Sequence, residues 1–185
     1  IGFGTMNGKD GKPYKTRQGG VPRLENLIGE INEEMLRKIK ENAATKGYQV
    51  DDAEAEKTAK IVGLAAIKYG DLSNQASKDY IFDIDRFTSF EGDTGPYILY
   101  TIVRIKSILA KYVEQGGCLD NVTIGAAQNA SEKALMLEIT KFNAMMENAC
   151  AETAPHKVCA YIYDLANAFN KFYHDNPILN SEAEV

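Results

Sequence analysis

The sequence predicts a mainly α-helical protein, and three observations carry that prediction. Apolar residues recur at spacings of three and four over several long segments, which is the period of an amphipathic helix. Glycine, proline and capping residues stand where those segments should begin and end. No alternating pattern of strands and helices runs long enough for a complete nucleotide-binding α/β domain. We therefore expect a helical bundle preceded by a glycine-rich loop.

Composition limits the classes of function. The chain has 185 residues, of which 44% are hydrophobic and 25% charged, the balance of an ordinary globular protein. Its net charge of -5 argues against a protein that grips nucleic acid over its whole surface, so any such contact must be local. Three cysteines and the lack of an apolar run near 18 residues favour free thiols, no membrane span and a cytoplasmic location.

Residues 1–22 are rich in glycine and basic residues. We expect a short strand at residues 2–6 and then a flexible loop. The loop has one acidic residue, Asp10, and four basic residues, which are Lys9, Lys12, Lys15 and Arg17. Lysines on a glycine-rich backbone can follow and stabilise the charge of a polyphosphate. The alternative is a solvated tail, and the Walker spacing of a P-loop is lacking.

Two helices follow this loop. The first begins near Leu24 and is bounded by Pro22 before it and Gly47 after it. Its apolar stripe is Leu24, Leu27, Ile28, Ile31, Met35 and Ile39. The second begins at a capping box of Asp51 and Glu54 and should end where Gly70 and Asp71 break it. Its stripe is Ala55, Ala59, Val62, Ala66 and Tyr69.

Residues 80–85 alternate imperfectly, and we expect an extended connector that does not belong to a sheet. We interpret Asp83, Asp85, Glu91 and Asp93 as capping and turn residues and expect no metal there.

The stretch from Lys68 to Arg104 carries the most distinctive pattern, because it combines aromatic residues, a glycine turn and the start of a helix at Pro96. Thr94 should cap this helix, and Gly116-Gly117 should end it. Its apolar positions are Ile98, Ile102, Ile105, Leu109 and Tyr112. Tyr97, Tyr100 and Arg104 share a neighbouring stripe, where two rings and a guanidinium could stack unpaired bases and contact a phosphate. The two tyrosines could equally be half-buried packing groups, and both interpretations stay open.

Two further helices complete the expected bundle. One runs from Ser131, with Leu135, Ile139, Phe142 and Met146 inward. The other runs from Pro155, with Val158, Ile162, Leu165, Phe169 and Phe172 inward. Cys150, His156 and Cys159 lack a fourth ligand for a closed zinc site, so we interpret them as buried thiols beside a surface histidine.

Several segments resemble arginyl-tRNA synthetases, the class I enzymes with a helical anticodon-binding domain. They are KYGDLSNQ, KDYIFDIDRFTSFEGDTGPYILYTIVR and YIYDLANAFNKFY, together with GKDGKPYKTR at the place of the lysine signature of class I. The resemblance implies a helical bundle of the class I anticodon-binding type, preceded by a glycine-rich loop from the end of an α/β catalytic domain. It also implies that the last helix, KVCAYIYDLANAFNKFYHDNP, forms one wall of the anticodon site, with Tyr161, Leu165, Ala166, Phe169 and Phe172 in the core.

The resemblance also implies roles for particular segments. Residues 1–22 would be the signature-lysine loop, with Lys15 and more weakly Lys12 stabilising the phosphates of ATP bound with Mg²⁺. Residues 23–95 would be stem-contact helices and a connector. Residues 96–185 would be the anticodon-binding bundle, in which Tyr97, Tyr100 and Arg104 contact tRNA(Arg).

The chain starts at an isoleucine and stops at a helix-like beginning near Ser181, so we expect a piece of a longer enzyme. Such a piece would be inactive alone, would hold no cofactor and would expose apolar surface that favours self-association. The alternative is a stand-alone helical RNA-binding or interaction module without catalysis.

Overall fold

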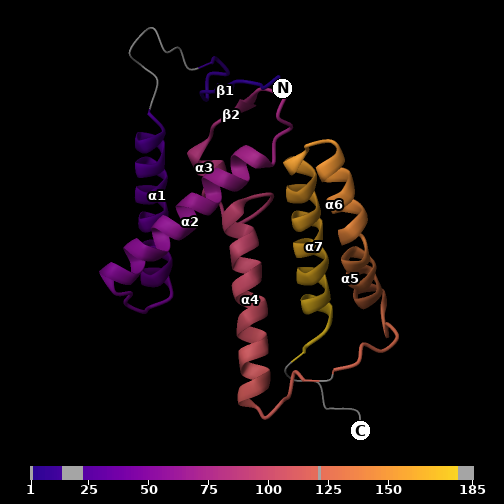
Figure 1. Ribbon diagram of the computed structural model, residues 1–185. Helices are drawn as coiled ribbons and strands as arrows, with labels where there is room; N and C mark the ends of the chain where they lie inside the picture. Colours follow the sequence, from indigo (N-terminus) through magenta and orange to yellow (C-terminus); the bar gives the residue numbers. More distant parts are fainter. Residues whose placement is uncertain (1, 14–22, 121, 179–185) are drawn as a thin grey trace. The chain divides into compact units, whose positions relative to one another are not determined.

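The computed structural model describes residues 2–13, 23–120 and 122–178, and these are mainly helical, as predicted (Figure 1). The chain divides into two compact units, Ile1–Leu99 and Tyr100–Val185, and each is described by itself. Unit 1 contains β1 (Met6–Asn7), α1 (Leu24–Thr45), α2 (Asp52–Leu72), β2 (Tyr80–Ile81) and α3 (Ile84–Phe87). Helix α4 (Gly95–Glu114) begins in unit 1 and continues in unit 2. Unit 2 also contains α5 (Ala130–Thr140), α6 (Phe142–Ala151) and α7 (Pro155–Asp175).

The core of unit 1 lies where α1 packs against α2. The buried residues are Leu27, Ile31, Met35, Ala59, Ala66, Phe82 and Phe87. Most of the predicted apolar residues of both helices therefore face the core, but Leu24 at the start of α1 is 63% exposed, so its predicted place in the stripe is wrong. The predicted cap of α2 is confirmed, because Asp51 accepts a hydrogen bond from the Glu54 amide at 3.0 Å. Burying this many apolar side chains is what stabilises the α1–α2 pair.

The expectation that Gly70 and Asp71 break α2 is wrong. Helix α2 continues to Leu72, and Gly70 is buried inside it. A Cβ atom at Gly70 would lie 2.5 Å from the Phe87 ring, so glycine is present here to let that ring approach the helix.

The expectation for residues 80–85 is also wrong, because Tyr80–Ile81 joins a two-stranded parallel sheet with Met6–Asn7. The Tyr80 amide donates to the Thr5 carbonyl at 3.0 Å, and the Phe82 amide donates to the Asn7 carbonyl at 2.8 Å. The strand expected at residues 2–6 is therefore shifted to Met6–Asn7. Each strand alone is too short to be recognised from its own residues.

Helices α5 and α6 pack against α7, which confirms the predicted bundle (Figure 1). The single helix expected from Ser131 is two helices, because the chain breaks at Lys141. Ile139, just before this break, is 55% exposed, so its predicted inward orientation is wrong. Phe142, just after it, is 50% exposed but turns toward α7, because its ring centre lies 6.1 Å from that of Tyr161.

Helix α7 keeps Tyr161 and Ala166 buried, in agreement with the predicted core, and half-buries Leu165, Phe169 and Phe172. Burial raises the pKa of the Tyr161 phenol.

The two ends of α4 agree with the sequence, but its buried face does not. Thr94 accepts a hydrogen bond from the Tyr97 amide at 3.2 Å, and Gly116 follows the helix with φ of 90°, a value that glycine tolerates. In the part of α4 that belongs to unit 2, the buried residues are Thr101 and Ile108, whereas Ile102 and Leu109 of the predicted stripe are exposed. Helix α4 therefore presents an apolar strip to solvent.

In the described ranges, no helix is long and apolar enough to cross a membrane. The three cysteines, all within the described residues, are not in disulfides; Cys159 is buried, whereas Cys118 and Cys150 are exposed, contrary to the expectation for Cys150. His156 is half-buried rather than on the surface.

Candidate nucleic-acid interface

The predicted stripe on α4 brings Tyr100 and Arg104 together. The Arg104 guanidinium carbon lies 4.7 Å from the centre of the Tyr100 ring, and its Nη2 donates to the Tyr100 hydroxyl at 3.0 Å. Tyr100 remains 48% exposed, so a base could still reach part of its ring. Tyr97 lies on the first turn of α4, where its side chain is half-buried, and it is not among the residues that line the groove described below.

Helix α7 supplies two further contacts to Arg104. The Arg104 Nη1 donates to the Asn170 side-chain oxygen, and its guanidinium carbon lies 5.6 Å from the centre of the Tyr173 ring. The Tyr173 ring is in turn nearly parallel to that of Phe169, at 6.2 Å between centres. Two tyrosine rings from different helices are thus held around one guanidinium.

A groove of about 600 Å³ runs beside this cluster. It is lined by Arg104, Lys111, Asn170, Tyr173, His174, Pro177 and Ile178. These described lining residues include two permanent cations and no carboxylate, although the chain as a whole carries a charge of -5. Flat rings beside a local positive charge are the features that single-stranded nucleic acid requires.

The sequence predicted that Arg104 and Tyr100 share one face of α4. It did not predict that Lys111, Asn170, Tyr173 and His174 line the groove beside them. A signal existed for the α7 residues, because positions 170, 173 and 174 share one helical stripe beside the apolar stripe of that helix. What no local pattern reveals is which stripe of α4 this stripe faces.

The predicted phosphate loop is only partly described, because Lys15 lies outside the described residues. Lys12 lies on a tight turn in which the Gly8 amide donates to the Lys12 carbonyl at 3.0 Å, and its side chain is exposed. An exposed ammonium on a glycine turn fits a phosphate group chemically.

Lys9 is not one of the free cations that the sequence led us to expect. Its ammonium lies 2.7 Å from Asp85 and 3.2 Å from Asp83. The hydrogen bond to Asp85, followed by that to Asp83, raises the pKa of Lys9. Asp83 also caps α3 by accepting from the Asp85 amide at 3.0 Å, which confirms the capping role predicted for it. Lys9 therefore ties the glycine-rich turn to α3.

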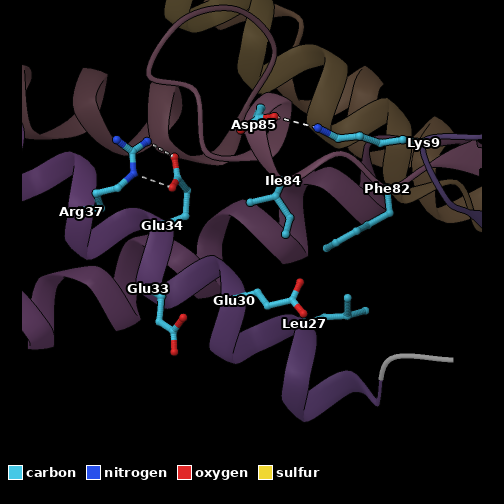
Figure 2. A pocket seen from close by; sticks show the side chains of 9 residues that line it. All are labelled: Lys9, Leu27, Glu30, Glu33, Glu34, Arg37, Phe82, Ile84 and Asp85. Carbon is cyan, nitrogen blue, oxygen red and sulfur yellow. Dashed lines mark hydrogen bonds and ion pairs between the residues drawn. The ribbon is translucent and has the colours of Figure 1, made fainter. Parts of the chain in front are cut away.

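A second pocket, of about 590 Å³, lies between α1 and this turn (Figure 2). Its lining residues are Lys9, Leu27, Glu30, Glu33, Glu34, Arg37, Phe82, Ile84 and Asp85. Arg37 is held by both oxygens of Glu34, at 2.6 and 2.8 Å, and Lys9 is held by Asp85. Because both cations are already paired and carboxylates outnumber them, this pocket does not suit a phosphate group.

Comparison with known proteins assigns these units to a class. The sequence model of the catalytic domain of class I (R) tRNA synthetases matches residues 1–84. The model of the DALR anticodon binding domain matches residues 98–185. The chain thus combines part of a class I aminoacyl-tRNA synthetase catalytic domain with an anticodon-binding domain.

Individual relatives narrow this class. Over its whole length the chain is 69% identical to the arginine–tRNA ligase of Agathobacter rectalis and 54% identical to that of Alkaliphilus oremlandii. It spans 31% and 30% of the length of these two relatives. The solved arginyl-tRNA synthetase of Thermus thermophilus is 28% identical, with a TM-score of 0.67 over 98% of this chain and 27% of that one. The Plasmodium falciparum enzyme is also 28% identical, with a TM-score of 0.69 over 86% of this chain and 28% of that one. The chain belongs to the arginyl-tRNA synthetase family.

Proposed function

We propose that this chain is part of an arginine–tRNA ligase, an enzyme that uses ATP to activate arginine and then attaches the arginine to tRNA(Arg). The observation that carries the proposal is the 69% identity to the Agathobacter rectalis enzyme over the whole chain. Because the chain spans 31% of that protein, the complete reaction belongs to the longer protein. We expect the 185 residues alone to be inactive, since adenylate formation needs ATP, arginine and the catalytic groups in one geometry.

In this proposal residues 1–22 act on the phosphates of ATP, which is bound with Mg²⁺. ATP supplies the adenylyl group that activates the carboxylate of arginine. Lys15, and more weakly Lys12, would stabilise the negative charge on the phosphates during this step. The support from the described residues is the exposed position of Lys12 on its glycine turn. Residues 23–95 would contact the tRNA stem and connect the two functions.

Residues 96–185 would bind the anticodon loop of tRNA(Arg) in the cytoplasm. The support is the groove beside Tyr100 and Arg104, which pairs ring faces with local positive charge. Tyr97 is included on the strength of its place on the predicted stripe. A base stacked on one of these rings would contribute about 1–3 kcal/mol to binding.

Self-association of the 185-residue chain also forms part of the proposal. Helix α4 exposes apolar side chains at Ile102, Val103, Leu109 and Val113, with exposed fractions between 42% and 62%. Burying this strip against a second copy would remove apolar surface from water. The expected result is a concentration-dependent molecular mass in analytical ultracentrifugation.

The direct test is a binding titration of the 185-residue chain with an unmodified tRNA(Arg) transcript and with another tRNA, at two salt concentrations. We expect a preference for tRNA(Arg) at matched salt and weaker binding of both at high salt. A stand-alone RNA-binding module without this specificity would bind the two tRNAs equally. Arginine-dependent pyrophosphate exchange with tRNA present should stay at background, and exchange above background would contradict the assignment of activity to the longer protein.

A single substitution separates base stacking from packing at Tyr100. If the ring stacks on a base, Tyr100→Ala weakens tRNA binding by about 5- to 150-fold with little change in melting temperature, since Tyr100 is 48% exposed. A lower melting temperature with unchanged affinity would instead show that the ring is a packing group. The control is Lys106→Ala, at an exposed position of the same helix that is not among the groove's lining residues.

A further inference from the structure

Arg104 is bound to protein groups on several sides before any ligand arrives. Its Nη1 donates to Asn170, its Nη2 donates to the Tyr100 hydroxyl, and its guanidinium lies against the rings of Tyr100 and Tyr173. A cation committed to two hydrogen bonds and two rings is poorly placed to turn outward to a phosphate.

The partner of Arg104 on α7 is itself oriented. The Asn170 side-chain nitrogen donates to the Thr101 hydroxyl at 3.1 Å, and Thr101 is only 3% exposed. This bond uses the amide nitrogen, so the amide oxygen faces Arg104. A continuous chain of hydrogen bonds therefore runs from the buried Thr101 through Asn170 and Arg104 to Tyr100, and it joins α4 to α7.

We infer that Arg104 is a positioning residue, which holds the Tyr100 and Tyr173 rings ready for an unpaired base of the RNA, and that Lys111 supplies the phosphate contact. This inference rests on the proposed function of the groove. Lys111 lies seven residues after Arg104, two turns further along the same face of α4, and lines the same groove. Its side chain is exposed, and within the described residues no carboxylate lies at ion-pair distance from its ammonium. Lysine is a flexible point charge that suits a phosphate, whereas the planar fork of arginine suits fixed contacts.

The division of roles predicts different salt dependences. For single-stranded nucleic acid, each phosphate contact contributes about 0.7 to the slope of log K against log salt concentration. Lys111→Met should therefore reduce that slope by about 0.7 and weaken binding at low salt. Arg104→Met should weaken binding by about 5- to 150-fold, the loss expected for one stacked base, with the slope unchanged.

Arg104→Lys is the decisive variant because it keeps the charge and removes the planar fork. We expect it to bind the tRNA(Arg) transcript as weakly as Arg104→Met does. A double-mutant cycle with Tyr100→Ala adds an independent measurement. If Arg104 acts through the Tyr100 ring, Arg104→Met costs less than about twofold in the Tyr100→Ala background, whereas independent contacts would be additive.

A further variant tests the same inference from a site that RNA does not reach. Thr101→Val has nearly the same shape and removes the hydroxyl that orients Asn170, so it should weaken binding about two- to tenfold with an unchanged slope. It also serves if the Arg104 variants do not fold, which thermal unfolding would reveal. Wild-type affinity of Thr101→Val would contradict the inference.

Two results distinguish the inference from the proposal beneath it. If the wild-type chain binds the tRNA(Arg) transcript and Arg104→Lys binds equally well, while Arg104→Met lowers the salt slope, Arg104 is a phosphate contact and only this inference is wrong. If the wild-type chain shows no preference for that transcript, the proposed function is wrong, and the inference is wrong with it.

Discussion

The close approach of Phe87 to α2 makes Gly70→Ala an informative perturbation of unit 1. The added Cβ would lie 2.5, 2.6 and 2.7 Å from three atoms of the Phe87 ring, whereas ordinary carbon contacts are about 3.5–4.0 Å. Phe87 is 4% exposed and its ring meets that of Phe82 edge-on, with 5.1 Å between centres. The ring therefore has nowhere to move without disturbing the core.

The magnitude follows from two opposing effects. Overpacking of this kind lowers the free energy of unfolding by about 1–3 kcal/mol. Replacing glycine by alanine inside a helix raises it by about 0.5–1 kcal/mol. We expect a net destabilisation of about 1–2 kcal/mol. For a unit of this size that corresponds to a fall in melting temperature of about 4–15 °C.

Gly29→Ala is the matched control. Gly29 lies inside α1, and among the described residues, apart from its chain neighbours and the nearby backbone of α1 itself, no heavy atom lies within 4 Å of the Cβ that would be added there. The same chemical change should therefore stabilise the protein by about 0.5–1 kcal/mol. Thermal unfolding of the 185-residue chain, followed by far-UV circular dichroism, compares the two variants. If Gly70→Ala is as stable as Gly29→Ala, the argument from the Phe87 contact is wrong; if the contact is real, Phe87→Leu should cost less in the Gly70→Ala background than alone.

Two further outcomes are expected. In the longer protein, Lys15→Ala should slow adenylate formation by about 10- to 1,000-fold, as expected when one preorganised electrostatic donor is removed; pre-steady-state activation with arginine, ATP and tRNA measures it, and an unchanged rate would remove Lys15 from the mechanism. The hydrogen bond from Arg37 lowers the pKa of Glu34 below its ordinary value of 4.5, so Glu34 contributes stability that is complete above that value and is lost as the pH falls through the lowered pKa. Glu34→Gln should accordingly lower the melting temperature at neutral pH, and the difference from wild type should shrink below about pH 4.5; a constant difference across that range would show that the ion pair contributes nothing through its charge.

Local sequence determined the features of this protein that depend on neighbours along the chain. The period of α1, the Asp51 cap of α2 and the Thr94 cap of α4 follow from residues within one or two helical turns. Since helix hydrogen bonds join residues four apart, spacing and caps are sufficient to place them. The long matches to arginyl-tRNA synthetases were likewise visible in consecutive residues.

Tertiary structure decided everything that depends on residues distant in the chain. The pairing of Tyr80 with Met6, the contact of Phe87 with Gly70 and the approach of Asn170 to Arg104 each join segments that no local period relates. A strand of two residues carries no pattern of its own, and a glycine in a helix looks like a helix end until its neighbour is known. In the same way, the Arg104 guanidinium looked like a ligand for phosphate while only α4 was considered. It became a candidate positioning group once α7 supplied the partners, because the direction of a side chain's hydrogen bonds depends on the elements packed around it.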